Sequence, residues 1–292
     1  MARSSLSIAA VLLAALACGP GGSRVSFVSN ERPSGYNAGY NAQGAPSPSA
    51  AHQENPNGGF DLGDDDFLEP EHPAADTKQE RALVHIHGPN DRVCSGVVVG
   101  PRIVATAQRC LRGEAQGAAA IAEGRTWRVE IASSTLTWTN RTAKFAVLPK
   151  CDESDLDIAF LVLAEPAPSI VVPLKVASAP GTGARVHALG FGHCKGAAQP
   201  IKERIGTVQR RISESVTIDL ALCKGDVGGP VIDGLDGEVI GLISHRDSPE
   251  GSPLKTTTIA RLDTGPARNL LAQAKLLADG TAASKLPPIA CH

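Results

Sequence analysis

The stretch Cys223-Lys224-Gly225-Asp226-Val227-Gly228-Gly229-Pro230 is the part of the sequence from which the fold can be deduced. Glycine and proline occupy four of its eight positions, which is typical of a turn. An alternating apolar and polar run, 216–220, precedes this turn, and the β-branched pair 231–232 follows it. Two further short segments lie upstream: Thr106-Ala107-Gln108-Arg109-Cys110 and, after it, Asp155-Leu156-Asp157-Ile158-Ala159-Phe160-Leu161.

After residue 81 the sequence consists of short β-branched runs separated by turn residues, which is typical of an all-β domain. The stretch 127–131 alternates apolar and polar residues, as a half-buried antiparallel strand does. One helix is expected near the end, because Pro266 precedes apolar residues at helical spacing and Gly280 follows them. The remaining expected strands are 97–99, 103–105, 158–163, 186–189 and 239–243, and the helix would bury Leu270, Leu271, Ala274 and Leu277.

In their chain order the three short segments resemble those that carry the general base, the orienting acid and the nucleophile of trypsin/chymotrypsin-like serine peptidases. The resemblance covers roughly residues 82 to 277, since Cys94-Ser95-Gly96-Val97-Val98-Val99-Gly100 is similar to the strand before the base and Gly190-Phe191-Gly192 to the family's Gly-Trp-Gly turn. It implies two packed antiparallel β-barrels, roughly 82–170 and 171–262, with a C-terminal helix and a cleft between the barrels.

The residues at two of the three triad positions cannot perform the family's reaction. Val227 stands where the resemblance implies a serine, and it has no hydroxyl. Arg109 stands where it implies a histidine, and a guanidinium with a pKa above about 12 offers no lone pair. Only Asp157 matches. Removing such groups from a serine peptidase costs on the order of 10⁶ in turnover, so we expect a member of the family without this chemistry.

The surviving acid needs a new partner. We expect an ion pair between Arg109 and Asp157, because a close cation can satisfy a buried carboxylate. The alternative is that Arg109 extends into solvent and keeps its charged end in water. Backbone N–H groups that resemble an oxyanion hole, those of Gly225 and Val227, do not depend on side chains and are expected to persist.

The substrate cleft also departs from the family. Members that cleave after arginine or lysine carry an aspartate two residues before Cys223, where this chain has Ala221, followed by Leu222. The segment Ser244-His245-Arg246 resembles the Ser-Trp-Gly segment that lines the family's groove, and Arg246 would obstruct the specificity pocket.

Asp226 pairs in the family with an amino terminus released by activation cleavage. No Ile-Val-Gly-Gly-like start precedes Cys94 in this chain. Either a basic side chain replaces that terminus or the turn relaxes.

Other residues of the chain are possible substitutes for the missing catalytic groups. Ser95, Ser244 and His245 are candidates for a rearranged site, but a base without a neighbouring nucleophile does little chemistry. His85 and His87 alternate on an expected strand, yet two histidines without a third ligand are weak evidence for a metal. We therefore expect no metal centre and no cofactor.

The N-terminal part is expected to direct export. Residues 1–17 have the charged start and short apolar run of a signal peptide, and Cys18 follows as a candidate for lipid attachment. Residues 18–80 are rich in Gly, Pro, Ser and Asn and are interpreted as a disordered tether. The peptidase-like domain is expected at 81–279 and a short tail at 280–292.

The cysteine count agrees with lipid attachment. Seven cysteines leave one unpaired, whereas lipid attachment to Cys18 leaves six for disulfides. The resemblance implies a bridge between Cys94 and Cys110. The other four allow three connectivities, of which we favour Cys194 with Cys223 and Cys151 with Cys291.

Taken together, these observations predict an exported, tethered, non-catalytic protein that binds a protein or peptide of unknown identity. A formal net charge of −2 without a basic block argues against nucleic acid, and contact with a membrane is expected only through Cys18. Two alternatives remain open: an active serine endopeptidase or hydrolase with a rearranged site, and a structural lipoprotein of the cell envelope.

Overall fold

The computed structural model describes residues 74–89, 92–115, 117–121, 125–149, 156–192, 203–223, 225–234, 237–246 and 256–287. All of these belong to one compact unit, residues 64–292. The expected signal peptide, Cys18 and most of the expected tether lie outside the described residues. Within the described part of the chain, no helix has the length and apolar character needed to cross a membrane.

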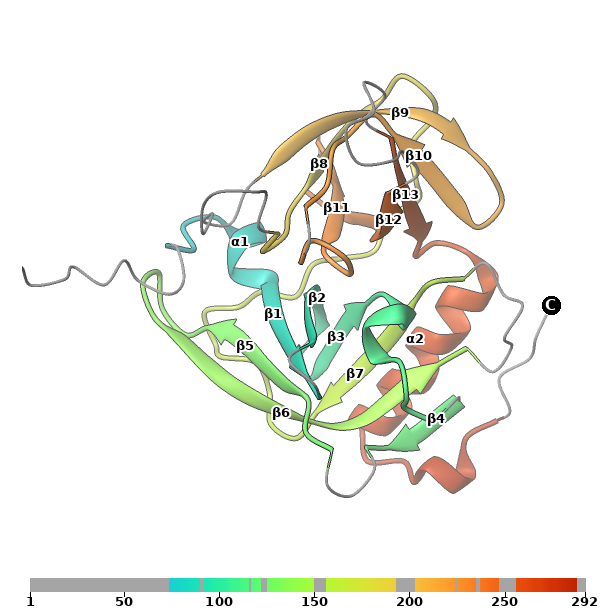
Figure 1. The fold of residues 1–292 in the computed structure, drawn as a ribbon. Helices are drawn as coiled ribbons and strands as arrows, with labels where there is room; N and C mark the ends of the chain where they lie inside the picture. Colours follow the sequence, from blue (N-terminus) through green and yellow to red (C-terminus); the bar gives the residue numbers. More distant parts are fainter. Residues whose placement is uncertain are drawn as a thin grey trace, which may run out of the picture. The chain divides into compact units, whose positions relative to one another are not determined.

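The first barrel is formed by the N-terminal strands of the described chain (Figure 1). Six strands pair antiparallel in the order β6-β5-β1-β2-β3-β7, and β7 pairs back with β6 to close the ring. A further strand, β4, pairs with β6. The bounds are β1 (Leu83–Gly88), β2 (Arg92–Gly100), β3 (Ile103–Thr106), β4 (Gly117–Ala120), β5 (Arg128–Ala132), β6 (Trp138–Leu148) and β7 (Ala159–Leu163).

The second barrel closes in the order β10-β13-β12-β11-β8-β9, again with antiparallel neighbours. Its interior holds β-branched and leucine side chains, among them Val186, Ile218 and Ile259, which are fully buried. Its strands are β8 (Arg185–Ala188), β9 (Arg204–Arg211), β10 (Ser215–Ile218), β11 (Pro230–Asp233), β12 (Val239–Arg246) and β13 (Thr257–Arg261). The expected all-β fold of two packed barrels is confirmed.

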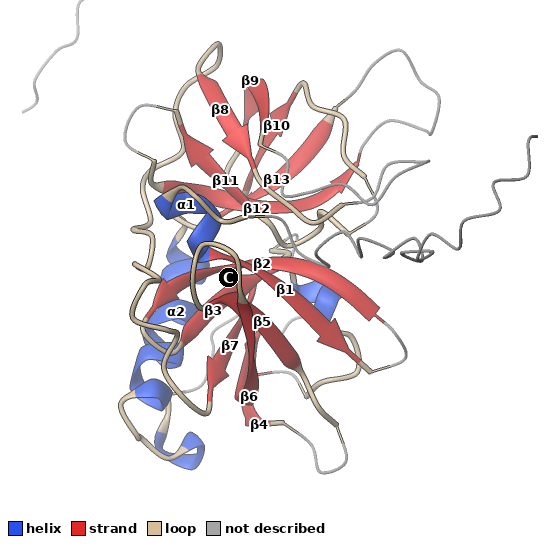
Figure 2. Cartoon of the chain, turned by 90° about the vertical axis from the view of Figure 1, so that its left-hand side faces the viewer, coloured by secondary structure: helices blue, strands red, loops and turns tan. Residues whose placement is uncertain are grey.

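The C-terminal helix α2 (Gly265–Ala278) is also confirmed. Thr264 caps its N-terminus by accepting a hydrogen bond from the Ala267 N–H, and Pro266 occupies the first turn, where a missing N–H costs nothing. The helix runs along the outside of the first barrel and packs against β7, β6 and β3 (Figures 1 and 2). The chain thus leaves the second barrel at β13 and returns to cover the first.

The junction between β13 and α2 is held by a buried ion pair. Arg261 makes two hydrogen bonds to Asp263, each 2.9 Å long. Burial alone would raise the pKa of Asp263, but the hydrogen bond and charge of Arg261, together with the Ala179 N–H and the charge of Arg211, outweigh it and hold the pKa below its ordinary value. Asp263 is therefore a carboxylate whenever the protein is near neutral pH.

The folded domain begins several residues before the expected boundary at residue 81. Ala75 is fully buried and donates its N–H to the Thr135 carbonyl at 2.8 Å. The short helix α1 (Lys78–Ala82) follows, with a capping box formed by Thr77 and Glu80. Two single-turn 3₁₀ helices, η1 (Gln108–Leu111) and η2 (Ala283–Lys285), complete the described elements.

The disulfide between Cys94 and Cys110 is present. Cys223 is disulfide-bonded as well. The pairings expected for the other cysteines involve Cys151, Cys194 and Cys291, which lie outside the described residues, so they stay predictions.

Candidate functional site

Arg109 and Asp157 meet because of the register of two strands. β3 pairs with β7 so that Thr106, the last residue of β3, lies opposite Ala159, the first of β7. Arg109 follows β3 by three residues, in η1, and Asp157 precedes β7 by two. Both residues therefore emerge at the same end of the first barrel, at the edge that faces the second barrel.

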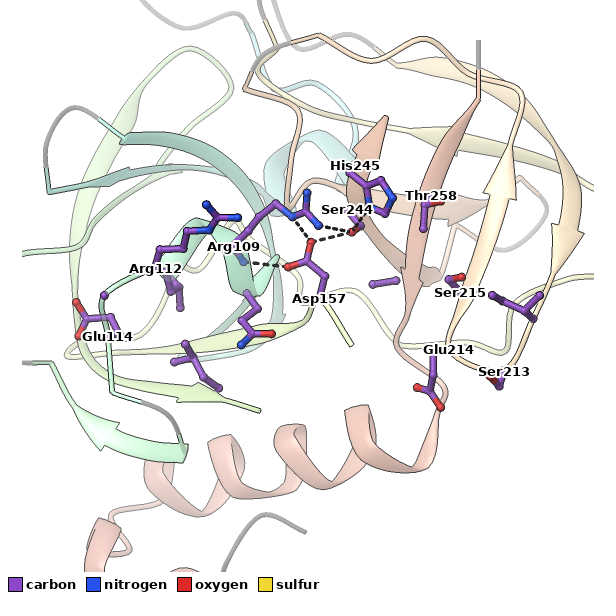
Figure 3. Close-up of a pocket in the computed structure, with 16 residues that line it drawn as sticks. Arg109, Arg112, Glu114, Asp157, Ser213, Glu214, Ser215, Ser244, His245 and Thr258 are labelled. Atoms are coloured by element: carbon purple, nitrogen blue, oxygen red, sulfur yellow. Dashed lines mark hydrogen bonds and ion pairs between the residues drawn. The ribbon is translucent and has the colours of Figure 1, made fainter. Parts of the chain in front are cut away.

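The Asp157 carboxylate accepts three hydrogen bonds (Figure 3). The Arg109 backbone N–H donates to Oδ1 at 2.9 Å, and the Arg109 Nε donates to Oδ2 at 2.5 Å. The Ser244 hydroxyl, from β12 of the second barrel, donates to Oδ2 at 2.7 Å. The expected ion pair is present, and its side chains are 36% (Arg109) and 12% (Asp157) exposed.

The turn 225–229 packs against β2 of the first barrel. Ser95 on β2 donates its backbone N–H to the Val227 carbonyl at 2.9 Å and its hydroxyl to the Gly225 carbonyl at 2.8 Å. Gly228 has a φ of 86°, and a Cβ there would collide with Thr106 Oγ1 and the Ser95 carbonyl oxygen. The Val227 carbonyl oxygen lies 3.7 Å from Cys110 Sγ, next to Arg109 in the chain. The turn and η1 are therefore close neighbours.

The side chain of Val227 is half-buried and packs against the larger of the two apolar cores, which contains most of the buried residues of the first barrel. Among the described residues, the N–H groups of Gly225 and Val227 donate no hydrogen bond. Both N–H groups are therefore available to donate to a bound oxygen atom, as the expected oxyanion-type role requires.

Asp226 has a cationic partner inside the chain. It is fully buried and forms an ion pair with Arg204 of β9. Its oxygens also accept hydrogen bonds from the Gly192 N–H at 2.8 Å and the Cys223 N–H at 2.7 Å. Asp226 is therefore paired with a basic side chain, that of Arg204, which takes the place of the amino terminus.

A cavity of about 640 Å³ opens beside the Arg109–Asp157 pair. Its walls come from both barrels: η1 and the residues after it on one side, and the β9–β10 hairpin, β12 and β13 on the other. The lining includes Arg109, Asp157, Arg112, Glu114, Glu214, Ser244 and His245, seen together in Figure 3.

Several residues expected in the cleft are placed elsewhere. Leu222 packs in the core of the second barrel and Asp226 is fully buried in its ion pair, so neither side chain is exposed in the cavity. Ala221 is half-buried. Ser244 and His245 do line the cavity, and the side chain of Arg246 lies outside what the structure describes.

Ser95 links the two barrels through hydrogen bonds of its side chain. It is fully buried, its hydroxyl donates to the Gly225 carbonyl, and its oxygen accepts the Phe191 N–H at 3.0 Å. It therefore joins β2, the 190–192 turn and the 225–229 turn. A serine so placed is structural and not available for attack on a ligand.

Two functional groups were missed from the sequence. Arg204 was missed because nothing in a run of basic residues on β9 shows which one reaches Asp226. Glu130 was missed as a companion of His85 and His87 because it enters only through the pairing of β1 with β5, which sets His85 opposite Glu130. The alternating pattern of 127–131 was the available signal, since it placed Glu130 on one face of an expected strand.

Comparison with known proteins agrees with this arrangement. Residues 94–242 match the family described as trypsin-like peptidase domain. One solved structure with a similar fold is neuropsin, a serine protease expressed in the limbic system of mouse brain, with a TM-score of 0.52 at 18% identity, covering 70% of this chain and 98% of that chain. No sequence among the curated proteins matches the chain.

The Arg109→Ala variant tests whether the ion pair stabilises the fold. Removing one partner of a buried pair costs about 3–5 kcal/mol, and the partial exposure of Arg109 and the two hydrogen bonds left on Asp157 reduce this to about 1–3 kcal/mol. Chemical denaturation at neutral pH measures it. The control is Arg112→Ala, an exposed arginine of the same cavity, for which we expect a change within about 0.5 kcal/mol. Equal stability of the two variants would contradict a structural role for the pair.

A second variant, Arg204→Met, tests the anchor of the 225–229 turn. It leaves the Asp226 carboxylate buried without its cation, so we expect a loss of about 3–5 kcal/mol in the free energy of unfolding. Adding Asp226→Asn should recover much of that loss, because a neutral amide tolerates burial better than a carboxylate. The matched control, Arg210→Met, changes an exposed arginine on the same strand. If Arg204→Met unfolds no more easily than this control, Arg204 does not anchor the turn.

Proposed function

The chain belongs to the trypsin-like peptidase family, and from this we propose that it is a non-catalytic member whose cleft binds a protein or peptide without cleaving it. The observation that carries the proposal is the contact between Arg109 and Asp157. In a serine peptidase the orienting carboxylate holds an imidazole that accepts the proton of the nucleophile. Here a permanent cation binds that carboxylate and accepts no proton.

The 225–229 turn supports the same conclusion independently. Acyl transfer needs an oxygen that attacks the substrate carbonyl, and Val227 supplies only an aliphatic side chain that packs toward the first barrel. The backbone donors of Gly225 and Val227 remain. Such donors stabilise a charge that develops during the reaction, but without a nucleophile they serve only to bind.

An active hydrolase with a rearranged site is the second candidate. One observation favours it: the Ser244 hydroxyl oxygen lies 3.0 Å from His245 Nδ1, which brings a hydroxyl and an imidazole together. However, Ser244 is only 2% exposed, and its hydroxyl proton is donated to Asp157. His245 then approaches that oxygen as a donor and cannot activate it. Ser244 is therefore a poor nucleophile, because it is buried and because its hydroxyl proton is directed to Asp157 and not to His245.

Two charged side chains that line the cavity, Glu214 and Arg112, have no partner of opposite charge among the described residues. Glu214, on the β9–β10 hairpin, has a buried Oε2 that accepts no hydrogen bond from the described residues. Arg112, on the opposite wall, is exposed, and its guanidinium forms no hydrogen bond or ion pair within the described chain. The Glu214 carboxylate lines the cavity and has no cationic partner among the described residues, so a ligand that brings a cationic group to this wall gains affinity. The partner class that fits is a peptide segment with a lysine or arginine.

Export and anchoring form part of this proposal and rest on the sequence alone. The signal-like residues 1–17, the cysteine at position 18 and the polar stretch that follows support a folded domain tethered at the cell envelope. A structural lipoprotein without a cleft ligand is the remaining alternative for the same features.

Selection from a displayed library of random peptides tests the proposal. We expect the wild-type protein to enrich peptides with a basic residue, and we expect those peptides to be recovered intact when analysed by mass spectrometry. Glu214→Arg should weaken their binding by at least about tenfold, because it replaces attraction with repulsion at the cavity wall. The matched control is Glu165→Arg, the same change at a side chain that is 71% exposed and does not line the cavity.

The possible outcomes separate the three candidate functions. Recovery of cleaved peptides would overturn the non-catalytic function and favour the hydrolase. Failure to enrich any peptide over the Glu214→Arg variant would overturn the binding function and favour a structural lipoprotein.

A further inference from the structure

Three ligand-type side chains converge on the outer face of the first barrel, and none of them lines the cavity beside the Arg109–Asp157 pair. His85 and His87 are two residues apart on β1, so their side chains lie on the same face of the sheet, while Val84 and Ile86 point into the core. Glu130 on β5 is the register partner of His85. Directly opposite residues on antiparallel strands have neighbouring side chains, which brings the carboxylate to the two imidazoles.

One atom from each residue points to a common centre. His87 Nε2 lies 2.8 Å from Glu130 Oε2, His85 Nδ1 lies 3.2 Å from the same oxygen, and the two nitrogens are 3.1 Å apart. The side chains are well shielded, with exposed fractions of 12% for His85, 24% for His87 and 10% for Glu130.

When Glu130 is an ionised carboxylate, no placement of protons on the two imidazole nitrogens makes all three contacts attractive. If both nitrogens carry a proton and donate to Glu130, two N–H groups face each other at 3.1 Å. If only one carries a proton, the bare nitrogen of the other ring directs its lone pair at a carboxylate oxygen. In either case, one of the three contacts among His85 Nδ1, His87 Nε2 and Glu130 Oε2 is repulsive. A cation in the centre attracts all three atoms at once.

The distances suit a first-row divalent ion. Zinc binds histidine nitrogen at about 2.0–2.1 Å and carboxylate oxygen at about 2.0–2.2 Å. A point about 2.1 Å from all three atoms exists roughly 1.1 Å above their plane, given their separations of 2.8, 3.1 and 3.2 Å. With such bonds, ligand atoms are about 3.3–3.4 Å apart around a tetrahedral ion and about 2.9–3.0 Å apart around an octahedral one. The observed separations of 2.8, 3.1 and 3.2 Å lie around the octahedral spacing and below the tetrahedral one.

We propose that His85, His87 and Glu130 form a binding site for a divalent transition-metal ion, with Zn²⁺ as the expected occupant. Two imidazoles and a carboxylate are a donor set that zinc accepts, and three protein ligands leave a further position for water. This site is separate from the cavity beside Asp157 and does not depend on the proposed function.

Two neighbouring residues, Phe191 and Arg128, contact the three-residue cluster. The His85 ring stacks on Phe191, with ring centroids 4.7 Å apart, and the next residue, Gly192, donates its N–H to Asp226. An ion that fixes His85 therefore also supports the 190–192 turn of the second barrel. Arg128 Nη2 lies 3.6 Å from the other oxygen of Glu130, so its positive charge opposes a bound cation.

Metal titration of the full chain, purified without a histidine tag and treated with a chelator, tests the site. Calorimetry with Zn²⁺ should give one site per chain, and Co²⁺ used as a probe should give visible absorption bands that report its coordination. Glu130→Gln and His87→Asn should each lower Zn²⁺ affinity by more than the roughly 10–100-fold that loss of an outer-shell partner costs. Arg128→Gln should tighten binding, because it removes a repelling charge.

The matched control is His187→Asn. His187 also pairs with a glutamate, Glu203, through a 2.5 Å contact, and neither is part of the three-residue cluster. Zn²⁺ affinity should be unchanged in this variant. Thermal melting without metal establishes that each variant folds, and His87→Asn changes the most exposed of the three ligands should Glu130→Gln fail to fold. Absence of Zn²⁺ binding to the wild type, or binding that His87→Asn leaves unchanged, would overturn the proposal.

Discussion

A carboxylate buried between two barrels has to be neutralised where it lies, and the site around Asp157 is organised by this requirement. The side chain is 12% exposed and accepts hydrogen bonds from the Arg109 backbone, the Arg109 guanidinium and the Ser244 hydroxyl. Because Ser244 belongs to the second barrel, the same carboxylate also ties the two barrels together. An uncompensated buried charge is destabilising, so a cation beside Asp157 stabilises the fold beyond what its hydrogen bonds provide. Arg109 provides this cation, and a guanidinium accepts no proton.

A similar substitution occurs at Asp226. An arginine from β9 satisfies the buried carboxylate, and the Gly192 and Cys223 N–H groups complete its coordination. The partner is part of the folded chain, so this turn does not depend on a new amino terminus. Both aspartates thus serve the architecture through arginine partners. The chain has the two barrels of the trypsin-like fold, and the proposed non-catalytic function explains why both carboxylates are paired with arginine.

Much of the fold was predictable because the residues that decide it are local. Continuous or alternating runs of β-branched residues predicted β2, β3, β5, β7, β8 and β10 to β12, and Pro266 and Gly280 predicted the limits of α2. Strands β4, β6, β9 and β13 were not predicted. Gly117–Ala120 is rich in alanine and β9 in arginine, and their strand form comes from pairing with neighbours. The Arg109–Asp157 contact followed from the order of family segments. The Arg204–Asp226 pair and the approach of Glu130 to the histidines depend on which strands pair and in what register, and one sequence does not reveal this.

The central claim is that Arg109 and Val227 leave this cleft without an attacking oxygen and without a base. The most direct measurement is covalent labelling by a fluorophosphonate, which reacts with an activated serine, in the wild type and in the double variant Arg109→His, Val227→Ser. The account predicts no specific labelling of the wild type and labelling of the double variant at residue 227, because Asp157 and the backbone donors of Gly225 and residue 227 are already in position. Stoichiometric labelling of the wild type that disappears in Ser244→Ala would contradict it and establish a working hydrolase.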